Sequence, residues 1–394
     1  MQRKVHVTGV GMVPFTRPSQ SRAYDEMAAD ATRMALKDAG LDYEKVQHAY
    51  VGYIYGDSTS GQAALYHVGA TGIPIINVNN NCSTGSTALF MARQAIEAGI
   101  IDCALALGFE QMRPGALGSM WNDRPTPMDR FETVAESTGH PDTGAPFAAR
   151  FFGSAGMQYA ETYGTDPKTF AQIAVKARAH AANNPNAVFR ERLSLDDVMN
   201  SPQIYGILTR YQCCPPTCGA AAAILCSDDF AKAHGLDRSV SILAQALTTD
   251  RGSSFEGDMR NAIGFDMAQA AADAVYESAG VAPTDIPVVE LHDCFTANEL
   301  LSYEALRLTP AGTAEKFIWD GDNTYGGRVV TNPSGGLLSK GHPIGATGLA
   351  QCAELTWQLR GQATGRQVEG ANLALQHNLG LGGACVVTLY GANN

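Results

Sequence analysis

Residues 82–89 read CSTGSTAL and residues 342–349 read HPIGATGL, and these two stretches decide the fold. At an offset of 260 positions the second lies over the first, with a glycine, a threonine and a leucine in common. The first stretch begins with Cys82 and the second with His342. A thiol and an imidazole at matching positions indicate two copies of one unit that face each other and build a single active site.

A second pair of stretches supports the duplication. Residues 27–40 and 267–280 both open on Met-Ala, close on Ala-Gly and have the spacing of an amphipathic helix, at an offset of 240 positions. A β-rich run follows each of them. Two matches in the same order indicate an internal repeat, and loops account for the difference between the two offsets.

The composition is that of a large globular protein. The chain has 394 residues, of which 45% are hydrophobic and 41 are glycine. This length is sufficient to form the hydrophobic cores of two or three domains. The formal net charge of −11 argues against nucleic acid and anionic membrane surfaces as main partners, although a local pocket can still bind an anionic CoA ester. No apolar run approaches the ~18 residues that a membrane span needs.

The nine cysteines lie mostly in apolar runs, and we expect them to be reduced. No signal peptide precedes them, because the chain passes from Met1 almost directly into a strand pattern, so we expect an intracellular protein. Residues 213–218 read CCPPTC. Adjacent cysteines followed by two prolines, with no histidine nearby, do not have the spacing of a tetrahedral metal site. We therefore expect buried or loop thiols here and no bound metal.

Strand and helix patterns alternate through the first part of the chain, which is typical of a mainly parallel sheet with helices on both faces. We expect strands at 4–12, 48–54, 73–79 and 103–109, and helices at 24–40 and 86–99.

The pattern changes between residues 112 and 218, where Pro, Asp, Asn and Arg are frequent and no strand pattern occurs. Residues 170–184 give the clearest helix of this insertion. An independent helical domain is one interpretation, but an insertion between two strands of one half favours a lid over the active site. The predicted division is 1–111 plus 219–237 for the N-terminal half, 112–218 for the loop domain and 238–394 for the C-terminal half.

The first segment that carries chemistry surrounds Cys82. A predicted strand ends, a polar turn follows, and the cysteine lies at the start of a helix. Free backbone N–H groups and the helix dipole at such a place lower the pKa of a thiol, and the same N–H groups can bind an oxyanion. An inert small residue at a helix start is the alternative, but the strand–turn–Cys–helix context favours a nucleophile.

The second segment is Gly341-His342-Pro343. Proline suits the first turn of a helix, so His342 is predicted at a helix entrance, where the dipole keeps an imidazole neutral. A lone histidine is usually structural. At the position matching Cys82, however, His342 is a candidate base.

The third segment, HDCF at residues 292–295, directly follows the predicted strand 286–291. Open α/β sheets bind ligands at this end of their strands. His292 could donate to a developing enolate oxygen, Cys294 could carry a proton, and Asp293 could be a turn former. An ordinary loop is the alternative interpretation.

The fourth segment, QHNLGLGG at residues 376–383, follows another predicted strand. Its glycines allow the backbone to approach a ligand closely and offer N–H groups to an oxyanion. A tight turn against a helix is the alternative. We interpret His377 as a structural hydrogen-bonding residue rather than a catalytic one.

These segments, together with NPSGGLLSKGHPIGATGLAQ at 332–351, resemble the thiolase superfamily over residues 4–391. Within it, the chain is similar to the branch of 3-ketoacyl-CoA thiolases associated with sterol carrier protein, and HDCF is the most branch-specific motif. The resemblance implies a thiolase fold, in which two similar α/β halves form a five-layered αβαβα core covered by a mainly helical loop domain.

The resemblance also implies a reaction, the CoA-dependent Claisen cleavage of a 3-oxoacyl-CoA to acetyl-CoA or propionyl-CoA and a shortened acyl-CoA. Cys82 would attack the 3-oxo carbonyl and His342 would accept its proton. His292, with His342, would stabilise the enolate, and Cys294 would protonate the enolate carbon and deprotonate CoA. The N–H groups of Cys82 and Gly382 would hold the tetrahedral oxygen. CoA is a cosubstrate, and no permanently bound cofactor or metal is implied.

One motif departs from other thiolases, whose acid/base cysteine lies in a Cys-x-Gly motif that here aligns with residues 380–382, GLG. That cysteine is absent. Cys385 lies farther on, inside a predicted strand, and is no convincing replacement. We expect Cys294 to take the role.

Other functions stay open at this point: a thiolase-like synthase, a retro-aldolase that needs a partner subunit, or a non-catalytic acyl-CoA or lipid-binding relative. The resemblance further implies lipid metabolism, such as fatty acid β-oxidation, and a homodimer. No sterol-carrier domain follows Asn394, and the C-terminus is not a Ser-Lys-Leu signal. We expect a bacterial cytoplasmic enzyme, or a peroxisomal one if the source is eukaryotic.

Overall fold

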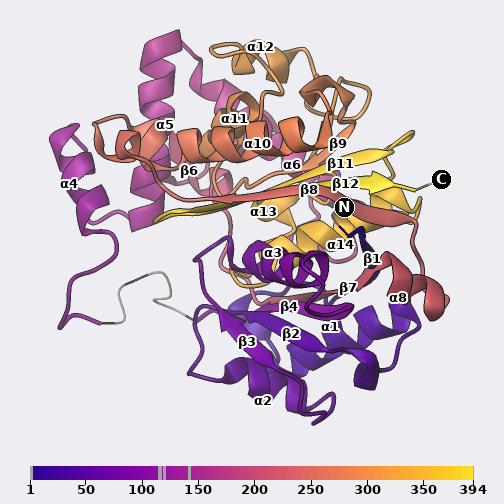
Figure 1. Ribbon diagram of the computed structural model, residues 1–394. Coiled ribbons are helices and arrows are strands. Elements are labelled where there is room, and N and C mark those ends of the chain that lie inside the picture. The colour runs from indigo at the N-terminus through magenta and orange to yellow at the C-terminus, as the bar shows by residue number, and fades with distance from the viewer. Residues whose placement is uncertain (1–2, 114–117, 119–120, 141–142, 394) are drawn as a thin grey trace.

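The computed structural model describes residues 3–113, 118, 121–140 and 143–393. The fold is an α/β thiolase fold with the predicted five layers (Figure 1). Helices α10 (Phe265–Ala279) and α11 (Thr296–Ala305) cover the outer face of one set of strands, and α1 (Tyr24–Ala39) and α2 (Ser60–Tyr66) cover the outer face of the other. Helices α3 (Thr84–Glu97) and α14 (Thr347–Leu359) lie between the two sets.

Ten of the described strands form one hydrogen-bonded array in two groups of five. The N-terminal group is β1 (Val5–Met12), β2 (His48–Gly52), β3 (Ile75–Val78), β4 (Cys103–Glu110) and β7 (Gly219–Ser227). The C-terminal group is β8 (Val240–Thr248), β9 (Val288–Glu290), β10 (Val330–Thr331), β11 (Leu373–Gly380) and β12 (Ala384–Ala392). The short hairpin of β5 (Gln203–Tyr205) and β6 (Leu208–Thr209) stands apart.

The described helices follow the same order in the chain. They are α1 (Tyr24–Ala39), α2 (Ser60–Tyr66), α3 (Thr84–Glu97), α4 (Asp129–Ser137), α5 (Phe147–Tyr163), α6 (Pro167–Ala181), α7 (Leu195–Met199), α8 (Asp228–Ala233), α9 (Met259–Ala262), α10 (Phe265–Ala279), α11 (Thr296–Ala305), α12 (Ala314–Trp319), α13 (Gly336–Ser339) and α14 (Thr347–Leu359).

The strand order shows the duplication directly. It runs β3-β2-β4-β7-β1 in the first half and β10-β9-β11-β12-β8 in the second. In both halves the first two pairings between neighbouring strands are parallel and the last two are antiparallel. The halves meet at the pairing of His6 with Ser241. The repeat inferred from two short stretches therefore extends over the whole topology.

Side-chain size decides how closely the central helices approach the strands. On β4, Ala104 and Ala106 face the central cluster that includes α3 and α14, whereas Leu105 and Leu107 face α1 on the outer side. Small residues toward the middle let two helices fit between two sheets. Burying each outward leucine fully contributes about 2 kcal/mol to folding.

Glycines in the twin stretches permit the closest contact between the halves. A Cβ added at Gly85 would lie 2.8 Å from the carbonyl oxygen of Gly345, and one added at Gly345 would lie 2.8 Å from the carbonyl oxygen of Gly52. These distances are shorter than carbon–oxygen contacts allow. The start of α3 can contact the turn before α14 only because Gly85 lacks a side chain, and Gly345 in that turn can lie against the end of β2 for the same reason.

The insertion differs from its prediction in two ways. Its clearest predicted helix, 170–184, is observed as α6, but α5 before it is longer, and the hairpin of β5 and β6 adds strands where none was expected. Aromatic side chains of α5 and α6 share one hydrophobic cluster with α10 and α11, which argues against an independent helical domain. The division into 1–111 plus 219–237, 112–218 and 238–394 stays a prediction. Among the described residues, no helix combines the length and apolarity that crossing a bilayer would require.

Candidate active site

Three predicted site residues converge between the two halves. The sulfur of Cys82 and a ring nitrogen of each of His292 and His342 all lie within 4.8 Å of one another. The two imidazole rings meet edge to face, with centroids 5.2 Å apart. Cys82 lies just before α3, His292 just after β9 and His342 shortly before α14. The duplicated scaffold thus brings three segments that are far apart in sequence to one point.

The Cys82 turn is fixed by local hydrogen bonds. Asn81 takes a left-handed backbone conformation (φ 48°), and its Nδ2 donates to the carbonyl oxygen of Leu381 at 2.8 Å. Thr84 Oγ1 donates to the carbonyl oxygen of Asn81 at 2.6 Å, where α3 begins. The turn therefore tethers the nucleophile segment to the GLGG segment of the other half.

The expected lowering of the Cys82 pKa is wrong. Burial, followed by the charge of Glu110, raises the pKa of Cys82 to about 12, and the backbone N–H groups of Cys82 and Leu381 oppose the rise without overcoming it. Desolvation of an anion outweighs two N–H groups here. Cys82 is consequently a neutral thiol that needs a base.

His342 is placed differently from the prediction. Helix α14 begins only at Thr347, so Pro343 lies in the preceding turn rather than in the first helical turn. The position of His342 is set by hydrogen bonds instead. Its backbone N–H donates to Thr217 Oγ1 (2.6 Å), and its Nδ1 lies 2.6 Å from Thr347 Oγ1.

The side chain of His342 has the properties of a base. Burial lowers the pKa of His342 to about 3, so its imidazole is neutral. Its buried Nε2 has no hydrogen-bond partner among the residues that the structure describes. A neutral imidazole beside a neutral thiol can accept the thiol proton as the sulfur attacks.

His292 is buried, and its side chain is held by Asn378, whose Nδ2 lies 3.1 Å from His292 Nδ1. Asn298 Nδ2 donates to the carbonyl oxygen of His292. Burial, followed by the charges of His342 and His377, lowers the pKa of His292 well below 6.5. His377 Nδ1 accepts the backbone N–H of His292 at 3.4 Å, a structural contact of the kind we predicted for it.

Cys294 is buried beside the cluster. Burial raises its pKa, and the thiols of Cys214 and Cys82 and the carboxyl of Asp293 raise it further. The backbone N–H of Cys214 donates to the carbonyl oxygen of Cys294 at 2.9 Å. The CCPPTC segment, which we predicted only as buried or loop thiols, therefore lies against the site, and its Pro216 pairs with His342.

Asp293 is more than the local turn former that the sequence suggested. Its carboxylate accepts the backbone N–H groups of Leu337 (2.7 Å) and Leu338 (3.3 Å), at the start of α13. This helix directly precedes the Gly341–Pro343 segment. Asp293 thus ties the HDCF segment to the segment that carries His342.

The GLGG segment also differs from its prediction, because β11 continues through Gly380 instead of ending before Gln376. Gly382 follows β11 with a positive φ of 93°, which favours glycine. Its role toward a tetrahedral oxygen stays a prediction. Cys385 lies on β12 opposite Leu379 and is buried, and it does not belong to the cluster of Cys82 with the two histidines.

Glu110 is a site residue that the sequence analysis missed. At the end of β4, its carboxylate accepts the backbone N–H groups of Ile54 (3.2 Å), Tyr55 (3.0 Å) and Gly345 (3.0 Å). Burial raises the pKa of Glu110 to about 7. A charged residue at the end of an otherwise apolar strand was the only signal in the sequence.

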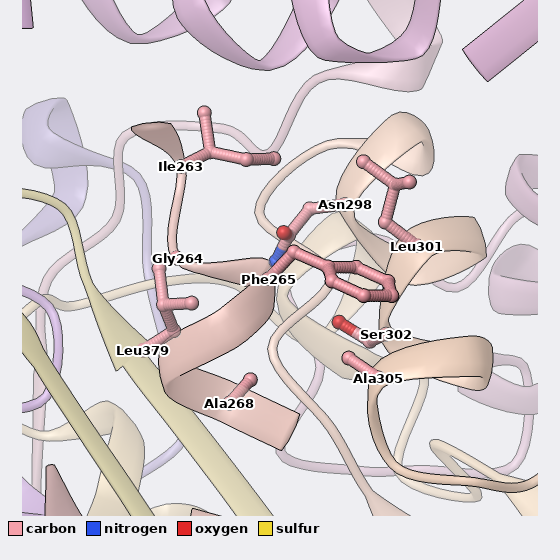
Figure 2. Close-up of a pocket in the computed structure, with 9 residues that line it drawn as sticks. All are labelled: Ile263, Gly264, Phe265, Ala268, Asn298, Leu301, Ser302, Ala305 and Leu379. Atoms are coloured by element: carbon pink, nitrogen blue, oxygen red, sulfur yellow. The ribbon is translucent and has the colours of Figure 1, made fainter. Parts of the chain in front are cut away.

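A small cavity lies where α10, α11 and β11 meet (Figure 2). Side chains of α10, α11 and β11 line it, among them Phe265, Asn298 and Leu379. Its volume of about 10 Å³ leaves room for a single water molecule and not for an acyl chain. It borders the site through Asn298, which binds the backbone of His292.

Comparison with known proteins shows the family of the chain. Residues 5–229 match the family described as "Thiolase, N-terminal domain", and residues 253–390 match "Thiolase C-terminal domain-like". The chain is 55% identical to sterol carrier protein 2 of Gallus gallus, over 99% of this chain and 72% of that protein. It is 33% identical to an acetyl-CoA acetyltransferase of Methanothermobacter thermautotrophicus, over 98% of this chain and 99% of that one.

Solved structures show the same fold. The structure titled "Ltp2-ChsH2(DUF35) aldolase" has a TM-score of 0.83 at 24% identity and covers 99% of this chain and 98% of that chain. Human mitochondrial 3-ketoacyl-CoA thiolase in complex with CoA has a TM-score of 0.74 at 17% identity, with 100% and 98% covered. The duplicated halves, the site between them and both family matches lead to one conclusion: the chain belongs to the thiolase superfamily.

Proposed function

We propose that the protein is a 3-oxoacyl-CoA thiolase, an acyltransferase that cleaves a 3-oxoacyl-CoA with CoA to acetyl-CoA or propionyl-CoA and a shortened acyl-CoA. The observation that carries this proposal is the convergence of Cys82, His292 and His342 within 4.8 Å, with Cys294 beside them. It provides a nucleophile and two imidazoles at one point, and a buried second thiol whose pKa Cys82 raises. The similarity to an acetyl-CoA acetyltransferase supports acyl transfer.

The first half-reaction uses all four side chains. Cys82 Sγ attacks the 3-oxo carbon while its proton passes to Nε2 of His342. The C2–C3 bond then breaks, which leaves an acyl thioester on Cys82 and the enolate of acetyl-CoA. His292 stabilises the enolate oxygen, and the proton of Cys294 goes to C2 to complete acetyl-CoA.

The second half-reaction restores the enzyme. The Cys294 thiolate removes the proton of CoA, whose sulfur attacks the acyl thioester. A tetrahedral intermediate forms, with its oxygen near the N–H groups of Cys82 and Gly382. The shortened acyl-CoA leaves, and Cys82 regains its proton from His342. Cys82 and Cys294 both end the cycle as thiols and His342 as a neutral imidazole, and the scheme uses no further cofactor.

The proposal extends to assembly and location. We propose a homodimer that pairs through β3, because this strand lies at the edge of the sheet and its Ile75, Ile76 and Val78 are only partly buried. Light scattering on the purified protein measures its mass and so distinguishes a dimer from a monomer. A role in lipid degradation, in a bacterial cytoplasm or a peroxisome, belongs to the same proposal.

The test is CoA-dependent cleavage of acetoacetyl-CoA and of a longer 3-oxoacyl-CoA by the wild type, Cys82→Ala and Cys294→Ala. We expect turnover only in the wild type, and an acyl adduct in intact-protein mass spectra only where Cys82 remains. A wild type that binds both substrates and cleaves neither would contradict thiolysis. It would favour a synthase, a partner-dependent retro-aldolase or a non-catalytic acyl-CoA or lipid-binding relative.

A further inference from the structure

Asn378 lies where the nucleophile segment and the HDCF segment meet. Its Nδ2 donates to the carbonyl oxygen of Cys82 (3.0 Å) and lies 3.1 Å from His292 Nδ1. Its Oδ1 accepts the hydroxyl of Ser86 on α3 at 2.8 Å. All three contacts are buried or partly buried. Through them, this one amide links α3, the Cys82 turn and His292.

The orientation of this amide is determined by its neighbours. A carbonyl oxygen only accepts, so the atom that faces Cys82 must be the NH₂ group. The Ser86 hydroxyl accepts from Gln376 Nε2 (2.7 Å), and its own proton is therefore available for Asn378 Oδ1. Gln376 is oriented in turn, because its Nε2 also donates to the carbonyl oxygen of Gly348 at 2.7 Å.

The proton position on His292 follows from that orientation. The second N–H of the Asn378 amide points at His292 Nδ1, which must therefore accept and carry no proton. A neutral imidazole has one N–H, so the proton of His292 is on Nε2. The ring then presents an N–H donor, which is what an enolate oxygen needs.

His342 has the opposite arrangement. Thr347 Oγ1 donates to the carbonyl oxygen of Pro343 at 3.0 Å, which occupies its only proton. We assign the contact of 2.6 Å between Thr347 Oγ1 and His342 Nδ1 as an N–H donated by the imidazole, with the Thr347 proton on the Pro343 carbonyl oxygen. The lone pair of His342 is therefore on Nε2, the atom without a partner among the described residues.

We propose that Asn378 and Thr347 are positioning residues that hold the two imidazoles in opposite tautomers, so that His292 donates a hydrogen bond while His342 accepts a proton. The catalytic meaning of this pair rests on the proposed function. The proton positions themselves rest only on the hydrogen bonds around the rings.

The same arrangement protects the site from thiophilic metal ions. Cys82, His292 and His342 offer three ligand atoms at close range, a set that suits zinc. Zinc needs the lone pair of an imidazole nitrogen, however, and Asn378 keeps a proton on Nε2 of His292. A carboxylate in place of the amide would reverse this, because it would accept a proton from Nδ1 and free Nε2 for the metal.

The first test is nitrogen-15 NMR of the wild type labelled on histidine. The couplings between ring nitrogens and carbon-bound ring protons distinguish the two neutral tautomers. His292→Gln and His342→Gln variants assign the signals. We expect a proton on Nε2 for His292 and on Nδ1 for His342. The reverse tautomer at either ring overturns the proposal, whether or not the protein cleaves 3-oxoacyl-CoA.

The second test is Asn378→Asp, a change of equal size. We expect kcat to fall about 10²-fold with KM nearly unchanged, since one enolate donor is lost. We also expect the variant, and not the wild type, to bind Zn²⁺ in calorimetry. Asn184→Asp is the matched control, because Asn184 is buried and its Nδ2 likewise donates to a carbonyl oxygen, that of Ser334 (2.8 Å).

The outcomes separate the two proposals. Equal zinc binding by wild type and Asn378→Asp, or equal loss of kcat in the Asn184→Asp control, would refute the role of Asn378. Opposite tautomers and zinc binding confined to Asn378→Asp, in a protein without thiolysis, would sustain the tautomer assignment and reject the thiolase proposal. Should Asn378→Asp not fold, the wild-type NMR result decides alone.

Discussion

The Cys82 turn and the His342 turn occupy equivalent places in the two halves, yet one carries a thiol and the other an imidazole. Both precede a central helix, and a glycine in each permits contact with the other half. The Cys82 turn leads into α3 within two residues, whereas the His342 turn runs five residues before α14 begins. The longer turn allows the His342 side chain to contact Thr347, the first residue of α14. The duplication accounts for the equivalent places of the two turns, and their different lengths account for their different side-chain contacts.

The largest effect is expected when the two residues are exchanged in one variant, Cys82→His with His342→Cys. We expect a loss of kcat of more than about 10⁴-fold, because residues that act as one unit fail together. Only the C-terminal turn has the Thr347 contact, and only the N-terminal turn has the tether from Asn81 to Leu381. Activity within tenfold of the wild type would mean that the two turns are equivalent.

Removal of the imidazole alone should have a smaller effect. His342→Asn is expected to lower the rate of Cys82 acylation about 10²- to 10⁴-fold, since a general base is lost. Rapid-quench measurement of the acyl enzyme gives that rate. His6→Asn is the control, a buried histidine outside the three-residue cluster whose ring contacts Asp228. An equal loss in both variants would indicate general disruption instead of a lost base.

The contact between the halves can be tested through Gly85. Gly85→Ala would place a Cβ 2.8 Å from the carbonyl oxygen of Gly345 and should lower the free energy of unfolding by about 1–3 kcal/mol. Urea unfolding provides the value. At Gly252 the nearest atom to an added Cβ is 3.7 Å away, so Gly252→Ala should change stability little. Equal effects at the two positions would show that the close contact is not needed.

The buried imidazole should also appear in the pH dependence of stability. Burial lowers the pKa of His342 from 6.5 to about 3, so in acid the unfolded state takes up a proton that the folded state does not. The stabilising contribution is present above pH 6.5 and is lost as the pH falls toward 3. Glu110, whose pKa is raised, has the opposite sign, and a single substitution is therefore the cleaner test.

As the pH falls from 7.5 to 5.5, we expect the free energy of unfolding to decrease by about 1.4 kcal/mol less in His342→Asn than in the wild type. Urea unfolding at both pH values measures the difference. The same decline in both proteins would mean that His342 is protonated in the folded state at pH 5.5.

The smallest effect is expected at Glu110, whose charge acts on only one of the twins. Its carboxylate raises the pKa of Cys82, so Glu110→Gln should lower that pKa, by about one unit or less. The pH profile of iodoacetamide alkylation of Cys82 would then move toward lower pH. A profile that does not move, or that moves toward higher pH, would contradict this electrostatic effect.

The candidate site was predictable where its chemistry is tied to residue type. Cys82, His292 and His342 were selected for their place after predicted strands or before a predicted helix, and the structure brings them together. The pKa of Cys82 was predicted in the wrong direction, because burial depends on what packs over the thiol. Glu110 and Asn378 were missed, since both act through backbone or ring contacts.

The duplication, the alternation of strands and helices, and the residue types at the site could be inferred from the sequence, because periodicity and turn chemistry are local properties. Which nitrogen of each imidazole carries the proton could not be inferred in this way. That depends on Asn378 from β11 and on the turn before Thr347, and therefore on contacts between segments that no local pattern connects. Burial, which sets the pKa of every group in the site, is likewise a property of the packed molecule.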